Sequence, residues 1–342
     1  MMTAPTIAVL GAGSWGTALA ILLARNGTPT LLWARDGEQA AAMNAGRCNP
    51  RYLPDITFPA ALGATADLEQ ALAAADDVLL AVPSHSFRAT LQAIAPYMTQ
   101  TTRLAWATKG LEQGSRKLLH QVAAEELGQE LAPAVISGPT FAREVAAGLP
   151  TAVTVASRDA AVARFFAGRL HDTTFRAYTS DDVTGVELGG AIKNVLAIAA
   201  GIADGMGMGA NTRAALITRG LAEMMRLGVA LGGQPETFMG LAGLGDLVLT
   251  CTDDQSRNRR LGLALGRGTA LEQARQDIRQ VVEGVQTAAE VWALASEHGV
   301  DMPITEQVWR VLHQQLPVPA AVEALLAREQ KEERDAGLGA RG

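Results

Sequence analysis

The feature that most constrains the fold of this chain is a glycine-rich turn close to its first residues. An apolar run over residues 6–10 is followed at once by GAGSWG, residues 11–16, and then by helical periodicity. Strand, glycine turn and helix in this order are typical of a dinucleotide-binding turn. In such a turn Gly11 allows the tight bend, Gly13 lets the backbone approach a pyrophosphate, and Gly16 lets the helix pack on the strand. We therefore expect a dinucleotide diphosphate at the start of this helix, where unpaired N–H groups lie.

The end of the next predicted strand, residues 29–33, bears on the choice of dinucleotide. An arginine at this point suits the 2′-phosphate of NADP(H), whereas an acidic residue accepts the ribose 2′-hydroxyl of NAD(H). The sequence has both, as Arg35 and Asp36. Asp36 could also serve only as the N-cap of the helix that follows. We predict NADP(H) as the preferred cofactor and keep NAD(H) as the alternative.

Strands and helices alternate over the first half of the sequence. Strand-like segments are expected at residues 77–82, 103–107, 134–137, 151–156 and 173–177. The alternation predicts an α/β fold, a Rossmann-like doubly wound parallel sheet with helices on both faces. From residue 181 onward the pattern is helical. We therefore expect a dinucleotide-binding domain over residues 1–180, an all-α substrate-binding domain over residues 181–330 and a flexible tail over residues 331–342.

Ligands of such sheets bind outside the carboxyl ends of the strands, and two of the predicted strands end in polar or small residues. Lys109 follows one strand, and Gly138 and Thr140 follow another. Lysine occurs at only four positions of the chain, so we expect Lys109 to contact substrate or phosphate. Gly138 would let a ligand approach the backbone, and Thr140 could line the ligand or cap the next helix.

A second rare lysine, Lys193, lies in a long apolar helix predicted over residues 185–207. An ammonium is a compact donor whose pKa responds to burial, which suits it to proton transfer, whereas arginine does not readily give up its proton. The alternative is a lysine that extends from a core helix to water. Because lysine is so rare here, we predict that Lys193 takes part in the chemistry.

Two further polar clusters follow in the helical half. Asp246 is expected at a helix start, where it could act as a cap. Ser256, Arg257 and Asn258 offer a hydroxyl, a guanidinium and an amide, which could bind a phosphate or form a solvated turn. Cys251 has apolar neighbours, so we expect an inert buried thiol in preference to a nucleophile.

Composition excludes several classes of function. The net charge of −6 and the lack of a basic stripe argue against nucleic acid. The two cysteines are far apart and the five histidines are isolated, so we expect neither disulfides nor a metal site. We see no apolar run long enough to span a bilayer and no basic region typical of a signal peptide, so we predict a cytoplasmic protein without stable membrane insertion.

The motifs taken together resemble one family. They are GAGSWG, ATKGLE at residues 107–112, SGPTFAREVAAGLPTA at 137–152, ELGGAIKNVLAIAAGIADG at 187–205, GLAGLGDLVLTC at 240–251 and QSRNRR at 255–260. The chain is similar to bacterial NAD(P)-dependent glycerol-3-phosphate dehydrogenases from about residue 6 to residue 327. The resemblance implies reversible reduction of dihydroxyacetone phosphate to sn-glycerol 3-phosphate for phospholipid synthesis.

The resemblance also implies residue roles. Lys193 would be the general acid and base, and Lys109 would touch both cofactor and substrate. The other implied substrate contacts are Gly138, Thr140, Asp246, Ser256, Arg257 and Asn258. The implied cofactor contacts outside the three glycines are Ser14, Trp15, Arg35, Ala142, Arg257, Val281 and Glu283.

Two rival interpretations stay open at this point, and so does the oligomeric state. One rival is a related two-domain dehydrogenase that acts on a different anionic hydroxy compound, such as a 3-hydroxy acid. The other is a non-catalytic NADPH-sensing or scaffold protein, which the two rare lysines disfavour. Apolar helices in the second domain are compatible with a homodimer.

Overall fold

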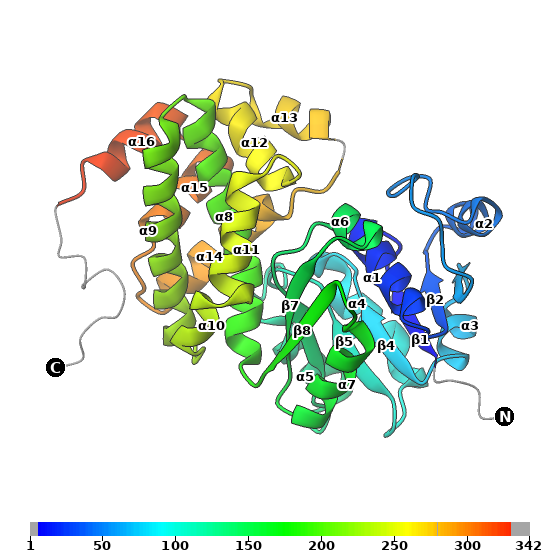
Figure 1. Cartoon of the computed structure of the whole chain (residues 1–342). Helices are drawn as coiled ribbons and strands as arrows, with labels where there is room; N and C mark the ends of the chain where they lie inside the picture. Colours follow the sequence, from blue (N-terminus) through cyan, green and yellow to red (C-terminus); the bar gives the residue numbers. More distant parts are fainter. Residues whose placement is uncertain (1–5, 279, 330–342) are drawn as a thin grey trace. The chain divides into compact units, whose positions relative to one another are not determined.

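The computed structural model describes residues 6–278 and 280–329 as two compact units (Figure 1). The first extends to Lys109 and resumes over Leu119–Val183, and the second consists of Gly110–Leu118 and the chain from Thr184 onward. The tail predicted at residues 331–342 lies outside the described residues.

The first unit is built on one eight-stranded sheet in the order β3-β2-β1-β4-β5-β6-β7-β8. Its strands are β1 (Ile7–Leu10), β2 (Thr30–Trp33), β3 (Leu62–Thr65), β4 (Asp77–Leu80), β5 (Arg103–Trp106), β6 (Ala134–Ser137), β7 (Thr151–Ala156) and β8 (Phe175–Ser180). Neighbouring strands are parallel except that β7 runs antiparallel to β6. The predicted α/β sheet is confirmed, but the sheet is mixed. A connection with only the short α6 (Ala142–Ala147) returns the chain directly beside β6, without the crossover that a parallel pair needs.

The other helices of this unit are α1 (Ser14–Arg25), α2 (Gly37–Gly46), α3 (Leu68–Ala73), η1 (Ser84–Ser86), α4 (Phe87–Ile94), η2 (Ala95–Tyr97), α5 (Leu119–Leu127) and α7 (Ala160–Leu170). One strand, β3, was missed in the sequence. Its sequence LGAT has one large apolar residue and a glycine and so carries no strand pattern.

The second unit is all-helical, as predicted. It contains α8 (Val183–Gly205), α9 (Gly209–Ala230), α10 (Pro235–Met239), the π-helical turn η3 (Leu241–Gly245), α11 (Asp246–Thr252), α12 (Arg257–Gly266), α13 (Leu271–Ile278), α14 (Glu283–Glu297), α15 (Pro303–His313) and α16 (Val318–Leu326). Residues 110–118, expected in the first domain, also belong here. Leu111 and Leu118 join the apolar core of this unit, and the Gly114 N–H donates to Glu290 Oε1 at 3.3 Å.

Helix α8 is the core of the helical unit. It has 23 residues and a mean hydropathy of 1.5 over its most apolar window, and that window is 100% buried. In length and hydropathy it therefore passes the test for a membrane span, contrary to the expectation that no segment would. Its complete burial among other helices identifies it as the core helix of a globular unit.

Helices α8 and α12 approach each other through glycine on both sides. A Cβ on Gly201 would lie 2.2 Å from Arg259 O, and one on Gly262 would lie 2.1 Å from Ile198 O. Gly205 and Gly266, one turn further along each helix, are equally close to the opposite backbone. The two helices thus pack backbone against backbone, with no side chain between them at these four positions.

A buried carboxylate joins α9 to the start of α15. Glu223 is 1% exposed and accepts hydrogen bonds from Ile304 N at 2.6 Å, Thr305 N at 3.1 Å and Thr305 Oγ1 at 3.0 Å. These contacts satisfy N–H groups that a helix start leaves unpaired. Burial raises the pKa of Glu223 to about 7 despite these hydrogen bonds.

The raised pKa of Glu223 predicts a pH dependence of stability. Between its ordinary value of 4.5 and about 7, the folded state holds a proton that the unfolded state has lost, so stability falls as the pH rises through this window. We expect the free energy of unfolding of the wild type, relative to Glu223→Gln, to decrease by roughly 2 to 3 kcal/mol from pH 5 to pH 7.5. Urea unfolding of both proteins at several pH values measures this difference. A difference that does not change with pH would contradict the assignment.

Candidate functional site

The glycine turn of the first unit has the geometry of a diphosphate cradle. Gly11 has a φ of 119°, and a Cβ there would lie 2.7 Å from Ala81 O. A Cβ on Gly16 would lie 1.9 Å from Gly11 O, whereas one on Gly13 would meet nothing within 4 Å. Two glycines are thus required by packing, and the third leaves the backbone open on one side.

Two observations fit a nucleotide diphosphate at this turn. Gly13 is the N-cap of α1 and no side chain caps the helix, so N–H groups of its first turn are available to an acceptor. The indole Nε1 of Trp15 is buried and has no hydrogen-bond partner among the residues that the structure describes. A ligand rich in acceptor oxygens would satisfy both kinds of donor, and the positive end of the helix dipole favours its charge.

The turn is held in place by residues that the sequence analysis missed. The carbonyl of Ala12 accepts from Gln39 Nε2 at 2.9 Å and from Asn49 Nδ2 at 3.1 Å. The same Asn49 amide lies 2.8 Å from Thr17 Oγ1, and Asn49 is 0% exposed. Asn49 begins a proline-rich segment without periodicity, so no sequence signal connected it with the turn.

Arg35 and Asp36 differ in their surroundings. Arg35 is exposed just beyond β2. Asp36 is the N-cap of α2, and its carboxylate accepts from Glu38 N at 2.9 Å and from Gln39 N at 3.4 Å. The capping alternative for Asp36 is therefore confirmed, and this carboxylate is already engaged by backbone donors.

The structure brings Lys109, Gly138 and Thr140 together at the carboxyl ends of β5 and β6. Lys109 Nζ lies 3.4 Å from Gly138 O, and Thr140 Oγ1 donates to the same carbonyl at 3.2 Å. A Cβ on Gly138 would lie 2.9 Å from Val153 Cα, so the position requires glycine. Thr140 does not cap α6, because Phe141 is the N-cap and no side chain caps that helix. Ala142 is the first residue of α6 and is half-buried.

In the helical unit Lys193 is buried in an ion pair. Its Nζ lies 2.5 Å from Asp246 Oδ1 and 3.1 Å from Thr250 Oγ1, and Lys193 and Asp246 are 6% and 0% exposed. Lys193 therefore does not extend to water, and that alternative is wrong. The carboxylate stabilises the ammonium form, which is the form that can donate a proton.

The backbone around Asp246 differs from the predicted helix start. Residues Leu241–Gly245 form a π-helical turn that continues directly into α11, so Asp246 is inside a helical run and does not cap it. The turn packs closely on α8, since a Cβ on Gly189 would lie 2.4 Å from Ala242 O. Short π-helical segments are frequent at functional sites, and this one brings the Asp246 carboxylate to Lys193.

The start of α12 forms the second part of the site in this unit. Ser256 is the N-cap and accepts from Arg259 N, while Arg257 Nη1 donates to Val281 O at 2.9 Å. Asn258 Nδ2 donates to Asn194 Oδ1 at 2.9 Å, and Asn258 Oδ1 accepts from the N–H of Gly284, next to Glu283, at 2.9 Å. The predicted residues Ser256, Arg257, Asn258, Val281 and Glu283 thus lie in one neighbourhood.

Asn194 is a candidate site residue for which the sequence predicted no role. It is 4% exposed, and its Nδ2 has no hydrogen-bond partner among the described residues. It is adjacent to Lys193 and bonded to Asn258, so it connects the ion pair with the α12 start. Its position next to a rare lysine was the one available signal.

Cys251 is not a nucleophile candidate in this environment. The thiol is 1% exposed, and burial raises its pKa to about 12. A thiol in that state remains protonated near neutral pH and is unreactive. The expectation of an inert buried cysteine is confirmed.

Comparisons with known proteins assign the chain to a family. Residues 6–163 match the N-terminal region, and residues 182–323 the C-terminal region, of the NAD-dependent glycerol-3-phosphate dehydrogenases. The chain belongs to this family. It is 57% identical over 334 residues to the glycerol-3-phosphate dehydrogenase (NAD(P)+) of Xanthomonas campestris, covering 97% of this chain and 98% of that one.

Other relatives agree with the family assignment. The chain is 60% identical over 332 residues to the enzyme of the same name from Thioalkalivibrio sulfidiphilus, covering 97% and 100% of the two chains. The crystal structure of glycerol-3-phosphate dehydrogenase from Coxiella burnetii has a TM-score of 0.92 and 52% identity, over 95% of this chain and 99% of that one. The resemblance found in the sequence is therefore confirmed, and the protein is an oxidoreductase of the NAD(P)-dependent glycerol-3-phosphate dehydrogenase family.

The open side of Gly13 gives a test of the cradle. We expect Gly13→Val to weaken NADPH binding by at least about tenfold, since a side chain would fill the space of the diphosphate, while the melting temperature changes little. Fluorescence titration with NADPH and thermal unfolding measure the two effects. Gly16→Ala is the matched control, because its Cβ would collide with Gly11 O and should lower stability as well. Unchanged NADPH affinity in Gly13→Val would refute the cradle.

Proposed function

We propose that the protein catalyses the reversible NAD(P)H-dependent reduction of dihydroxyacetone phosphate to sn-glycerol 3-phosphate, with Lys193 as the general acid. In the cell this reaction would supply the glycerophospholipid backbone in the cytoplasm. The observation that carries the proposal is the buried Lys193–Asp246 pair, at 2.5 Å, beside the buried Asn194–Asn258 contact. The family assignment supports the same substrate.

Proton transfer is the task proposed for Lys193. Reduction of a ketone places negative charge on its oxygen, and an ammonium in hydrogen-bond reach stabilises that charge and then donates its proton, an effect typically worth about 10²- to 10⁴-fold. In the reverse direction the neutral amine accepts the proton from the alcohol. Asp246 and Thr250 would hold Nζ in place, because both contact it directly.

Phosphate binding is the task proposed for the start of α12. The Arg257 guanidinium carries five N–H donors, of which the contact with Val281 O uses one, so others can reach a phosphate. Ser256 and Asn258 would add hydroxyl and amide donors, and Asp246 would contact a substrate hydroxyl in addition to Lys193. Binding energy from the phosphate can then be used to orient the reacting carbon.

Cofactor contacts are proposed for the glycine turn and for six further residues. The residues are those of the glycine turn, Gly11, Gly13, Ser14, Trp15 and Gly16, together with Arg35, Lys109, Ala142, Arg257, Val281 and Glu283. When bound, the nicotinamide would supply the hydride. Lys109, Gly138 and Thr140 are proposed to contact the substrate as well, since Lys109 Nζ and Thr140 Oγ1 already meet at one carbonyl.

The direct test is NADPH oxidation with dihydroxyacetone phosphate, repeated with unphosphorylated dihydroxyacetone and with a panel of keto acids. We expect turnover of the phosphorylated ketone and a much higher KM without the phosphate. Faster turnover of a keto acid than of dihydroxyacetone phosphate would contradict the proposed substrate and would indicate a hydroxy-acid dehydrogenase. No turnover of any of them would favour a binding protein.

Substitution of Lys193 tests the proton-transfer role. We expect Lys193→Arg to lower kcat by about 10²- to 10⁴-fold, because arginine keeps the charge beside Asp246 but does not readily release a proton. Lys193→Ala should be at least as impaired, and it also leaves a buried carboxylate unpaired. Steady-state kinetics give kcat, and NADPH titration should show intact cofactor binding. Near-normal turnover in Lys193→Arg would refute the role.

Cofactor preference is proposed to depend on Arg35. Because the Asp36 carboxylate already caps α2, we propose that Arg35 binds the 2′-phosphate of NADPH and that NADPH is preferred over NADH. Arg35→Asp should shift the ratio of kcat/KM values toward NADH by at least about tenfold, the effect of losing one charge-assisted hydrogen bond. Kinetics with both cofactors measure the ratio. An unaltered ratio would mean that another residue binds the 2′-phosphate.

A further inference from the structure

Arg259 carries a buried charge that the proposed chemistry does not use. It lies in the first turn of α12, directly after Ser256, Arg257 and Asn258, and is 8% exposed. A buried guanidinium costs free energy unless its donors are paired. The identity of its partners therefore indicates what the residue does.

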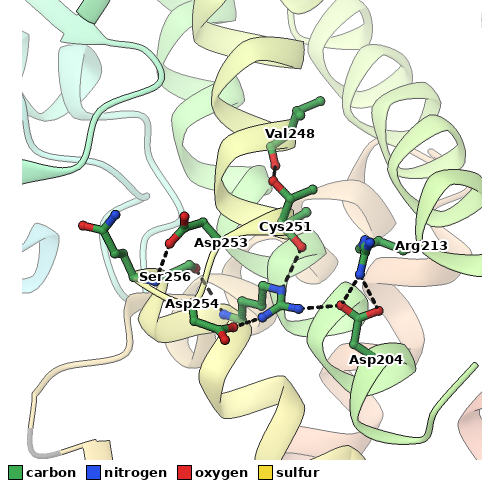
Figure 2. A network of polar contacts seen from close by, with 10 residues as sticks. Asp204, Arg213, Val248, Cys251, Asp253, Asp254 and Ser256 are labelled. Carbon is green, nitrogen blue, oxygen red and sulfur yellow. Dashed lines mark hydrogen bonds and ion pairs between the residues drawn. The ribbon is translucent and has the colours of Figure 1, made fainter. Parts of the chain in front are cut away.

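The Arg259 guanidinium binds three separate parts of the helical unit. Its Nε donates to Cys251 O, near the end of α11, at 3.0 Å, and its Nη2 lies 2.6 Å from Asp204 Oδ2, near the end of α8. Its Nη1 pairs with the Asp254 carboxylate in the loop that joins α11 to α12. Figure 2 labels these three partners, Asp204, Cys251 and Asp254, and marks their contacts with dashed lines.

The Asp204 carboxylate has a second cationic partner. Arg213 Nη1, from α9, lies 3.1 Å from Asp204 Oδ1 and 3.0 Å from Oδ2. Figure 2 marks both contacts with dashed lines. Arg213 makes the same kind of ion pair as Arg259 and is 32% exposed at its side chain. It reaches α8 from α9 and makes no hydrogen bond to α12 within the described part of the chain, so it provides a matched comparison within one network.

The backbones of α8 and α12 lie close together beside the Arg259 contacts. The two helices meet through Gly201 and Gly205 on one side and Gly262 and Gly266 on the other, which lets the backbones approach closely. Sliding of one helix along the other would press a side chain against the opposite backbone, so these glycines restrict the register of the two helices. The side chains of the first turn of α12 and the loop before it are held in addition by polar contacts.

Two polar contacts of this kind exist, at different heights along α8. Asn258 binds Asn194, which is next to Lys193 in α8. Arg259 binds Asp204, which follows Lys193 by eleven residues. At 1.5 Å per residue, this second contact lies about 16 Å further along the helix. Together they fix both the position and the direction of the α12 start relative to α8. Arg259 also holds the preceding loop through Asp254, and with it the residues that come just before Ser256.

We propose that Arg259 is a positioning residue that holds the first turn of α12 and the loop before it on α8, and thereby sets the distance from the phosphate-binding residues Ser256, Arg257 and Asn258 to Lys193. The inference rests on the proposed function, because it assigns those residues to the substrate phosphate. In this proposal Arg259 acts through those residues and makes no contact of its own with substrate or cofactor. A displacement of about 1 Å at a reacting centre can lower the rate by about 100-fold, so the placement of the α12 start has consequences for catalysis.

The test compares Arg259→Met with Arg213→Met. Both variants remove one ion pair to Asp204, but only the first releases α12. We expect Arg259→Met to raise the KM for dihydroxyacetone phosphate by about tenfold or more, with a smaller change in kcat. The reason is that the charge-assisted hydrogen bonds between the start of α12 and the substrate phosphate would be weakened. Arg213→Met should change that KM by less than about twofold, since it leaves the α12 contacts in place.

Unphosphorylated dihydroxyacetone separates positioning from general loss of structure. It has no phosphate for these residues to bind, so its kcat/KM in Arg259→Met, measured at saturating NADPH because Arg257 is also a proposed cofactor contact, should stay close to that of the wild type. Arg259→Lys, which can still pair with one carboxylate, should have an intermediate KM for the phosphorylated ketone. This variant also provides the measurement if Arg259→Met does not fold.

Two results would overturn the inference. One is that Arg259→Met and Arg213→Met have the same KM for dihydroxyacetone phosphate. If Arg259→Met does not fold, the corresponding result is that Arg259→Lys has the same KM as the wild type. The other is an equal loss of kcat/KM on both ketones, which would indicate a purely structural role. Failure of the proposed function is recognised separately, because the wild type itself would then not turn over dihydroxyacetone phosphate.

Discussion

The helical unit depends on one interaction, the ion pair between Lys193 and Asp246. Both charges are removed from water, and such a pair is tolerated only when the geometry is good and the remaining donors and acceptors are satisfied. Three local features provide that geometry. Gly189 lets the π-helical turn approach α8, the turn brings Asp246 to Nζ, and Thr250 occupies a further donor of the ammonium. A cation held in this way is fixed in direction before any ligand arrives, which is what preorganised catalysis requires.

The sequence predicts features that depend on local pattern. The glycine turn, the alternation of strands and helices, and the rare Lys193 are each visible within a short window, and the α/β sheet and helical half followed from them. Partners that are distant in sequence were not predictable in this way. Nothing local connects Asn49 with Ala12 or Lys193 with Thr250, because these contacts arise only when the elements pack. The strand β7 itself was predicted, but its antiparallel direction was missed, since strand direction depends on the connection and leaves no mark in the strand itself.

The helix-capping roles that were predicted from the sequence depended on helix boundaries that a sequence does not define to one residue. Three polar residues near helix starts were each given a capping alternative, and only Asp36 caps its helix. Thr140 precedes the actual N-cap by one residue, and Asp246 lies within a continuous helical run. Capping requires an extended backbone at the capping residue and a helix that starts immediately afterwards, so an error of one residue in the boundary changes the role of the side chain. The side chains that do not cap are those that contact other candidate site residues.

The hydropathy of α8 has a consequence for how the chain is made. The helix is as apolar as a membrane-spanning segment, and its covering helices, α9, α12, α14 and α15, all follow it in the sequence. During synthesis α8 therefore leaves the ribosome before the surfaces that will bury it exist. For that interval the nascent chain presents an uncovered apolar helix, the kind of surface that chaperones bind and that promotes aggregation. The element that carries the proposed proton donor is thus also the first helix of its unit to be made, and it must wait for its partners.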